Sequence, residues 1–137
     1  MALTHLLDTS VLTRLREPTV REAIEPRVEL AELARAGISD LEIGFSARNA
    51  AEWDRLIDAL NMFDLVETTA EHMRRAGQVQ RLLASKHQRG RKLPDLLVAA
   101  AAEAGRLTVL HYDADFDLIA AATGQACEWV VPAGSVD

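Results

Sequence analysis

Residues 93–120 read LPDLLVAAAAEAGRLTVLHYDADFDLIA, and this stretch decides the fold class. Pro94 suits the first turn of a helix and Gly105 is a natural C-terminal cap, so we expect a helix between them. Residues 107–110 form a short apolar run typical of a buried strand, and Asp113 begins another helix. Helix, strand and helix in succession are typical of an α/β domain.

The same alternation of short strands and longer helices extends over the rest of the chain. Residues 5–7 are expected to form a strand that ends at Asp8, and residues 36–38 to close a second strand. Residues 65–66 form a short third strand, and residues 129–131 form the last one. We therefore predict an α/β domain with a mostly parallel sheet that helices cover on both faces.

Capping residues and prolines predict where two of the helices begin or end. Ser39 and Glu42 have the spacing of a capping box, in which Ser39 caps a helix and Glu42 bonds back to it. Pro26 is expected to end a short helix over residues 21–25, because proline removes a helical hydrogen bond.

Length and composition narrow the class of protein. The chain has 137 residues, which fits a single domain over residues 1–137. No apolar run approaches the roughly 18 residues of a membrane span. The single cysteine, Cys127, allows no internal disulfide, and this favours a reduced, cytoplasmic setting.

The net charge of −6 does not by itself favour nucleic-acid binding, which needs basic side chains for the phosphates. The basic residues are concentrated, however, in the segment KHQRGRK over residues 86–92. Either this segment is a solvated loop, or it contacts a nucleic-acid backbone. In the second case the contacts come from Lys86, Arg89, Arg91 and Lys92.

Four carboxylates are expected at one edge of the sheet. Asp8 and Asp113 follow predicted strands, and Glu42 lies in the first turn of the helix after the second strand. Asp95 lies at the start of a helix that must run back to the next strand, so it belongs to the same edge. Because the carboxyl ends of parallel strands share that edge, the topology brings these side chains together.

Each acid alone also has a structural explanation, as a helix cap or as a charge that complements a helix dipole. The set as a whole does not, because four like charges in one crevice repel strongly. A bound cation removes this repulsion, and oxygen ligands suit a hard ion such as Mg²⁺ or Mn²⁺. The four histidines show no spacing typical of a zinc site.

The acidic segments resemble a known family. LLDTSVL (6–12), SDLEIGFSAR (39–48), LPDLLVAAAAEAG (93–105) and LHYDADFDLIA (110–120) are similar to the four acidic blocks of PIN-domain nucleases, especially those of VapC toxins. The match covers essentially the whole chain in the usual order. This resemblance implies a three-layer α/β/α sandwich around a parallel sheet of order 3-2-1-4-5.

The resemblance also implies a function. VapC toxins belong to type II toxin–antitoxin systems, and they are Mg²⁺- or Mn²⁺-dependent endoribonucleases, usually dimeric, that a VapB antitoxin silences. By position, the family's catalytic quartet corresponds to Asp8, Glu42, Asp95 and Asp113. The metal would be held by Asp8, Asp95 and Asp113, and Glu42 would position the attacking water or a second ion.

Three further positions follow from the same resemblance. Ser10 matches a small polar residue beside the first acid, and Asp115 matches a frequent fifth acid. His111 stands where many relatives have threonine. It is either a contact to RNA or to a neighbouring carboxylate, or a structural histidine.

Two other functions are alternatives to the nuclease. A haloacid-dehalogenase-like phosphatase would need a second aspartate at position 10, where Ser10 stands, so that pattern does not fit. A catalytically inactive PIN-fold module that binds RNA or protein remains open. An antitoxin would need an apolar surface, for which Val11, Leu12, Leu15 and residues 53–60 are candidates, unless these side chains are ordinary core.

Overall fold

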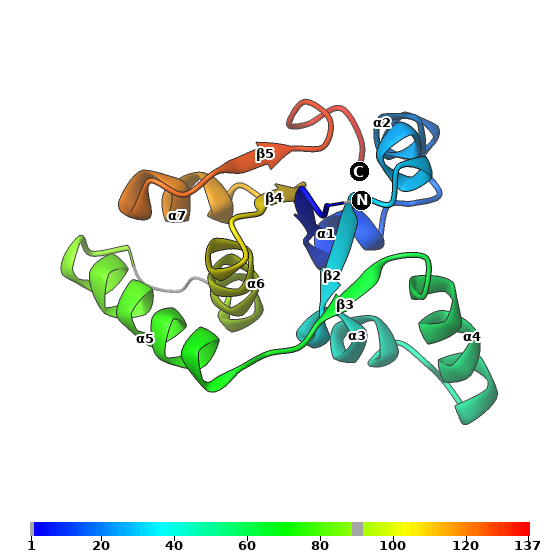
Figure 1. Cartoon of the computed structure of the whole chain (residues 1–137), viewed down its shortest axis with the longest axis horizontal. Helices are drawn as coiled ribbons and strands as arrows, with labels where there is room; N and C mark the ends of the chain where they lie inside the picture. The colour runs from blue at the N-terminus through cyan, green and yellow to red at the C-terminus, as the bar shows by residue number, and fades with distance from the viewer. Residues whose placement is uncertain (1, 89–91) are drawn as a thin grey trace.

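Helices and short strands alternate along the chain, as Figure 1 shows for the computed structural model. The structure describes residues 2–88 and 92–137. In chain order the elements are β1 (His5–Leu7), α1 (Thr9–Leu12), α2 (Pro18–Glu29), β2 (Leu33–Ala36), α3 (Gly37–Gly44), α4 (Ala50–Leu60), β3 (Asp64–Val66), α5 (Ala70–Ser85), α6 (Leu93–Ala104), β4 (Thr108–His111), α7 (Asp115–Thr123) and β5 (Cys127–Trp129).

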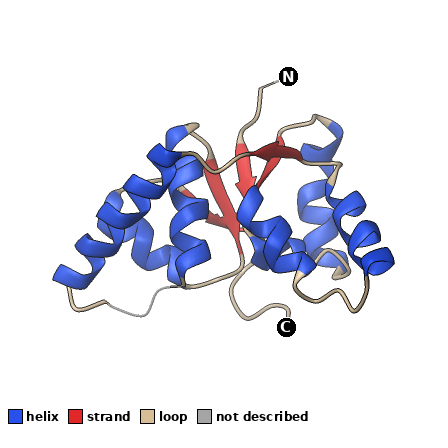
Figure 2. Ribbon diagram, turned by 90° about the horizontal axis from the view of Figure 1, so that it is seen from below, coloured by secondary structure: helices blue, strands red, loops and turns tan. Residues whose placement is uncertain are grey.

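The five strands form one parallel sheet in the order β3-β2-β1-β4-β5. This confirms both the predicted fold class and the strand order that the family resemblance implied. Figure 2 shows helices on both faces of this sheet, as a parallel sheet requires. β1 lies in the centre, paired with β2 and β4, so residues at its carboxyl end lie in the middle of one sheet edge.

Two apolar clusters form the core, one on each face of the sheet. Successive residues of β1 point to opposite faces, so Leu6 belongs to one cluster and Leu7 to the other. The first cluster packs the sheet against α5, α6 and α7, with Phe116 and Val98 fully buried. The second packs it against α1, α2 and the C-terminal end of α4. Helices therefore cover both faces of the sheet, so a functional site is expected at the ends of the strands.

The predicted boundary between β2 and α3 was wrong. β2 ends at Ala36 and the helix begins at Gly37, so Ser39 lies inside α3, fully buried, and does not cap it. The sequence concealed β2 because Arg35 interrupts its apolar run. In the structure Arg35 is nevertheless 5% exposed, and its neighbours in the strand are buried as well. The capping-box explanation of Glu42 is therefore excluded.

Other element boundaries also moved. α2 continues through Pro26 to Glu29, so the prediction that Pro26 ends this helix was wrong. The proline removes one backbone hydrogen bond, and it lies in the exposed last turns of the helix, where this loss is tolerated. α7 begins at Asp115 rather than Asp113, and β5 occupies Cys127–Trp129 rather than residues 129–131.

Arg35 fixes the position of α4 against the sheet. Its Nε and Nη2 atoms donate to the two carboxylate oxygens of Asp40 at 2.8 and 3.1 Å. Its Nη1 donates to the backbone carbonyls of Leu60, at 2.9 Å, and Phe63, at 2.5 Å. One guanidinium thus joins β2, α3 and the end of α4, and its charge is fully partnered.

Candidate metal centre and active site

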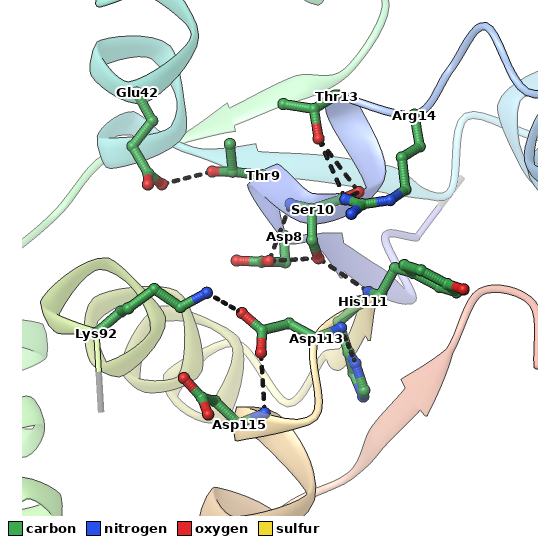
Figure 3. Close-up of polar contacts among 11 residues, drawn as sticks. Asp8, Thr9, Ser10, Thr13, Arg14, Glu42, Lys92, His111, Asp113 and Asp115 are labelled. Atoms are coloured by element: carbon green, nitrogen blue, oxygen red, sulfur yellow. Dashed lines mark hydrogen bonds and ion pairs between the residues drawn. The ribbon is translucent and has the colours of Figure 1, made fainter. Parts of the chain in front are cut away.

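Asp8, Asp95 and Asp113 come together at the carboxyl edge of the sheet. One oxygen of each carboxylate lies within 4.8 Å of one oxygen of the other two. Asp8 follows β1 and caps α1, Asp95 lies in the first turn of α6, and Asp113 lies between β4 and α7. The predicted convergence of these three acids is therefore present. Figure 3 shows the carboxylates of Asp8 and Asp113 close together, pointing to the same side.

Asp8 is held in one orientation by Ser10. The Oδ2 atom of Asp8 accepts hydrogen bonds from the backbone N–H of Ser10 at 3.0 Å and from its hydroxyl at 2.6 Å. Ser10 Oγ in turn accepts from the N–H of Tyr112 at 2.9 Å, which ties α1 to the end of β4. Asp8 is 2% exposed, and its Oδ1 atom has no hydrogen-bond partner among the described residues. Burial raises the pKa of Asp8, although the bonds from Ser10 oppose this.

Asp95 is the most perturbed of the three acids. It is 4% exposed, and its Oδ2 atom also has no hydrogen-bond partner in the part of the chain that the structure describes. Burial, followed by repulsion from Asp8 and Asp113, raises its pKa to about 8. A buried carboxylate oxygen without a hydrogen-bond partner is costly for a folded protein, and a nearby positive charge would offset this cost.

Asp113 already has a counter-charge. Its Oδ1 atom accepts from the N–H of Asp115 at 2.9 Å, and its Oδ2 atom forms an ion pair with Lys92. Burial on its own would raise the pKa of Asp113, but the bonds from Lys92 and Asp115 outweigh it and lower the pKa. Lys92, which had been expected to reach a nucleic-acid backbone, thus lies beside the acids (Figure 3).

Glu42 lies beside this cluster rather than in it. Its Oε1 atom accepts a hydrogen bond from the hydroxyl of Thr9 at 2.6 Å, and its charge contributes to the raised pKa of Asp8. The sequence had not indicated Thr9, because a contact between α1 and α3 leaves no local pattern. Of the four predicted acids, three therefore bring their carboxylate oxygens together, and the fourth, Glu42, lies beside them.

The basic segment is only partly described. Lys86 is exposed at the C-terminal end of α5, and Lys92 contacts Asp113. The predicted Arg89 and Arg91 lie outside the described residues.

His111 is a structural residue. Its side chain is fully buried and packs against the rings of Phe116 and Trp129, each with its centroid 5.0 Å away. Its Nδ1 accepts from the N–H of Asp113 at 3.3 Å, and burial lowers its pKa, which favours a neutral imidazole. A fully buried ring has no surface to offer RNA, so that alternative is excluded. His111 instead fixes the backbone of Asp113.

The three carboxylates fit a divalent cation. Two of them carry buried oxygens that no described residue satisfies, and the three offer oxygens close enough to share one ion. Oxygen-only ligands are those that hard ions such as Mg²⁺ prefer. A cation there would offset the like-charge repulsion that raises the pKa of Asp95.

Known proteins agree with this geometry. The family profile described as PIN domain matches residues 5–122. Ribonuclease VapC51 of Mycobacterium tuberculosis is 64% identical over 137 residues and covers both chains completely. Ribonuclease VapC21 of the same species is 42% identical over 98% of this chain and 99% of its own. A DNA-bound VapBC structure from Salmonella typhimurium superposes with a TM-score of 0.77 at 18% identity, over 94% of this chain and 99% of that one. The chain therefore belongs to the PIN-domain family and, within it, to the VapC group.

Proposed function

We propose that this protein is the toxin of a type II toxin–antitoxin pair, an endoribonuclease that hydrolyses RNA phosphodiesters with Mg²⁺ or Mn²⁺. The observation that carries the proposal is the buried, under-partnered cluster of Asp8, Asp95 and Asp113. Relatives of high identity over the full chain are named ribonucleases, which supports the choice of RNA as substrate.

Each acidic residue has a part in this reaction. Asp8, Asp95 and Asp113 would hold the cation, and Ser10 and the N–H of Asp115 orient two of these carboxylates. When bound, the cation offsets the charge of the phosphodiester and makes a water molecule more acidic. Glu42 accepts a hydrogen bond from the attacking water and orients it toward phosphorus. The water oxygen then bonds to phosphorus while the bond from phosphorus to a ribose oxygen breaks. The water releases one proton to solvent, and the departing ribose oxygen takes up one from solvent.

The RNA backbone would be held by the basic segment over residues 86–92, of which Lys92 lies beside the acids. With a cation in the cluster, Lys92 would be able to leave Asp113 and pair with a phosphate instead. We assign Lys86, Arg89 and Arg91 to the same contact because they belong to the same basic segment of the sequence. The exposed part of the Lys92 side chain, 59%, leaves it free to make this change.

The partner that silences the enzyme is a VapB-type antitoxin. A groove of about 370 Å³ between α1, α3 and α4 would take an apolar segment of it. Its apolar lining comprises Leu12, Leu15, Ile43, Leu56, Ala59 and Leu60. Val11, another candidate for this surface, is fully buried core and is excluded. Several solved structures of similar fold are VapBC complexes, in agreement with such a partner.

The remaining assignments concern the state of the protein in the cell. We assign residues 1–137 to one PIN domain that works as a homodimer in the cytoplasm. Among the described residues, no helix combines the length and the apolar character that a membrane span needs.

The test is cleavage of a total-RNA pool by the purified protein, with and without Mg²⁺ or Mn²⁺. Asp8→Asn and Asp95→Asn are compared with Asp54→Asn, which changes an exposed aspartate on α4 and serves as the matched control. Discrete, metal-dependent cuts should disappear in the first two variants and persist in the control. Equal cutting by all four proteins would point to a contaminant. Metal binding without any cutting would favour an inactive binding module instead.

A further inference from the structure

Two hydroxyl groups connect Glu42 to the segment that carries Asp8. Thr9 Oγ1 lies 2.6 Å from Glu42 Oε1 and 2.8 Å from Ser39 Oγ. Thr9 is the residue after Asp8, at the start of α1, whereas Ser39 and Glu42 both lie on α3. Ser39 is fully buried, so its hydroxyl has a fixed position next to Thr9. The three side chains form a chain of contacts across two helices.

Chemistry fixes the direction of these hydrogen bonds. A hydroxyl carries one hydrogen, and an ionised carboxylate can only accept. Thr9 therefore donates its hydrogen to Glu42, and Ser39 donates to the oxygen of Thr9. Hydrogen bonds to an ionised group are among the stronger ones in proteins, so the Thr9 contact can hold a long side chain that would otherwise rotate freely.

Glu42 would otherwise be free to approach the cation. Its negative charge is near enough to Asp8 to help raise the pKa of that residue, but the oxygens that share one point belong to Asp8, Asp95 and Asp113. Figure 3 shows the Glu42 carboxylate turned toward Thr9. The bond from Thr9 is the contact that keeps Glu42 at the side of the cluster.

We infer that Thr9, held by Ser39, is a positioning residue that keeps the Glu42 carboxylate beside the cation-binding acids and available to the attacking water. This inference rests on the proposed nuclease function. Without the Thr9 hydroxyl, Glu42 samples other rotamers, including ones that turn its carboxylate toward the cation. Water would then be oriented less often, whereas substrate binding and cation binding would remain.

A purely structural role for Thr9 predicts a different outcome. If the hydroxyls only tie α1 to α3, their loss lowers the stability of the fold and leaves the turnover of the folded enzyme unchanged. The kinetic constants of the folded fraction therefore distinguish positioning from stabilisation.

The experiment compares Thr9→Val, which keeps the shape but removes the hydroxyl, with Thr9→Ser, which keeps the hydroxyl. Thr19→Val, on the exposed side of α2, is the matched control. Cleavage of an RNA oligonucleotide that the wild type cuts gives kcat and KM, Mn²⁺ binding without RNA gives the ion affinity, and thermal unfolding reports folding.

We expect Thr9→Val to lower kcat by about 10- to 100-fold, the size of one hydrogen bond to a charged group. KM should stay within about twofold, Mn²⁺ affinity should be equal or tighter, and Thr9→Ser should restore most of kcat. Ser39→Ala, which removes only the outer bond, should cause a smaller loss of kcat and provides a second test if Thr9→Val folds poorly.

An unchanged kcat in folded Thr9→Val, or a loss that Thr9→Ser does not restore, would overturn the inference while leaving the nuclease proposal intact. Absence of metal-dependent cleavage by the wild type would instead overturn the proposed function, and this inference with it.

Discussion

Two groups of charged side chains differ in how completely their charges and polar atoms are partnered. Arg35 and Asp40 form a paired cluster, in which the guanidinium reaches a carboxylate and two backbone carbonyls. Asp8, Asp95 and Asp113 form a second cluster, in which like charges meet. We call it the unpaired cluster because two buried oxygens, one of Asp8 and one of Asp95, lack partners among the described residues, although Asp113 forms an ion pair with Lys92. In the first group the charge of Arg35 is fully partnered within the fold. In the second group the repulsion between the acids is only partly offset.

This difference separates a structural site from a functional one. Buried polar groups in proteins are nearly always hydrogen-bonded, so an exception calls for an explanation. The paired cluster explains itself, because it fixes α4 to β2. The unpaired cluster has no such structural role among the contacts described, and its oxygen ligands suit a hard cation that would supply the missing partner.

The largest effect on stability should come from breaking the paired cluster. Arg35→Met leaves the Asp40 carboxylate and two carbonyls without their donor, and loss of one partner of a buried ion pair costs about 3–5 kcal/mol of unfolding free energy. Urea unfolding measures this loss. Arg27→Met is the control, because the ion pair of Arg27 with Glu32 is partly exposed and such pairs contribute about 1 kcal/mol at most. Equal losses in the two variants would contradict the distinction.

The unpaired cluster should lower the stability of the fold instead of raising it. In the metal-free protein this effect should appear as a dependence of the unfolding free energy on pH. The Asp95 pKa is about 8 in the folded chain, against 3.8 for the free group, so within this window the folded state holds a proton that the unfolded state has released. Stability is therefore lost as the pH rises toward 8, by up to about 1.4 kcal/mol per pH unit. Asp8, whose pKa is also raised by burial, acts in the same direction.

Urea unfolding between pH 6.5 and 8 measures this slope without interference from His111. The pKa of that residue is lowered by burial from 6.5, so it affects stability only at lower pH. Asp95→Asn should flatten the slope, and so should Mg²⁺ in the wild type. A stability that stays constant or increases over this range would show that the cluster is not under electrostatic strain.

The edge at which the acids meet could be predicted because it depends on topology, whereas the strand order came from the family resemblance. Parallel strands place their carboxyl ends together whatever the residues between them, so Asp8, Asp95 and Asp113 needed no tertiary detail. The sequence misplaced β2 because a charged residue, Arg35, is not expected in a buried strand. Its burial is possible because it forms an ion pair with Asp40. Ser39 was then read as a cap, although it is buried inside α3.

Contacts between distant elements were out of reach of the sequence. Thr9 meets Glu42 across 33 positions, and Lys92 meets Asp113 across 21. Neither pair has a spacing that a helix or a strand repeats. The identities of the charged residues were informative, but which of them pair depends on the packing of α1 on α3 and of α6 beside β4.

The smallest effect should come from Lys92, a described basic residue that forms an ion pair with an acid of the unpaired cluster. Lys92→Met removes an ion pair with Asp113 whose lysine is largely exposed. Because the ammonium group competes with a cation for that carboxylate, we expect Mn²⁺ to bind a few-fold more tightly, in line with about 1 kcal/mol or less for such pairs.

RNA binding should change in the other direction in the same variant. KM should rise at low salt, and the slope of log KM against log salt concentration should fall by about 0.7, the value for one contact to a single strand. Lys86→Met, at the exposed end of α5, is the control for the Mn²⁺ affinity, because it removes a positive charge that has no ion pair with Asp113 among the described contacts. A tighter Mn²⁺ affinity in both variants would refute the direct competition.

The measurement that tests the account most directly is the affinity of the metal-free protein for Mn²⁺, with electron paramagnetic resonance as the method of detection. Wild type, Asp95→Asn and the surface control Asp54→Asn are compared at the same pH. Removing a supporting residue of a metal site weakens binding by about 10- to 100-fold, so losing a ligand should weaken it by at least about 100-fold. The control should bind like the wild type. Equal affinity in wild type and Asp95→Asn would contradict the claim that the unpaired acids of this sheet edge are the metal centre.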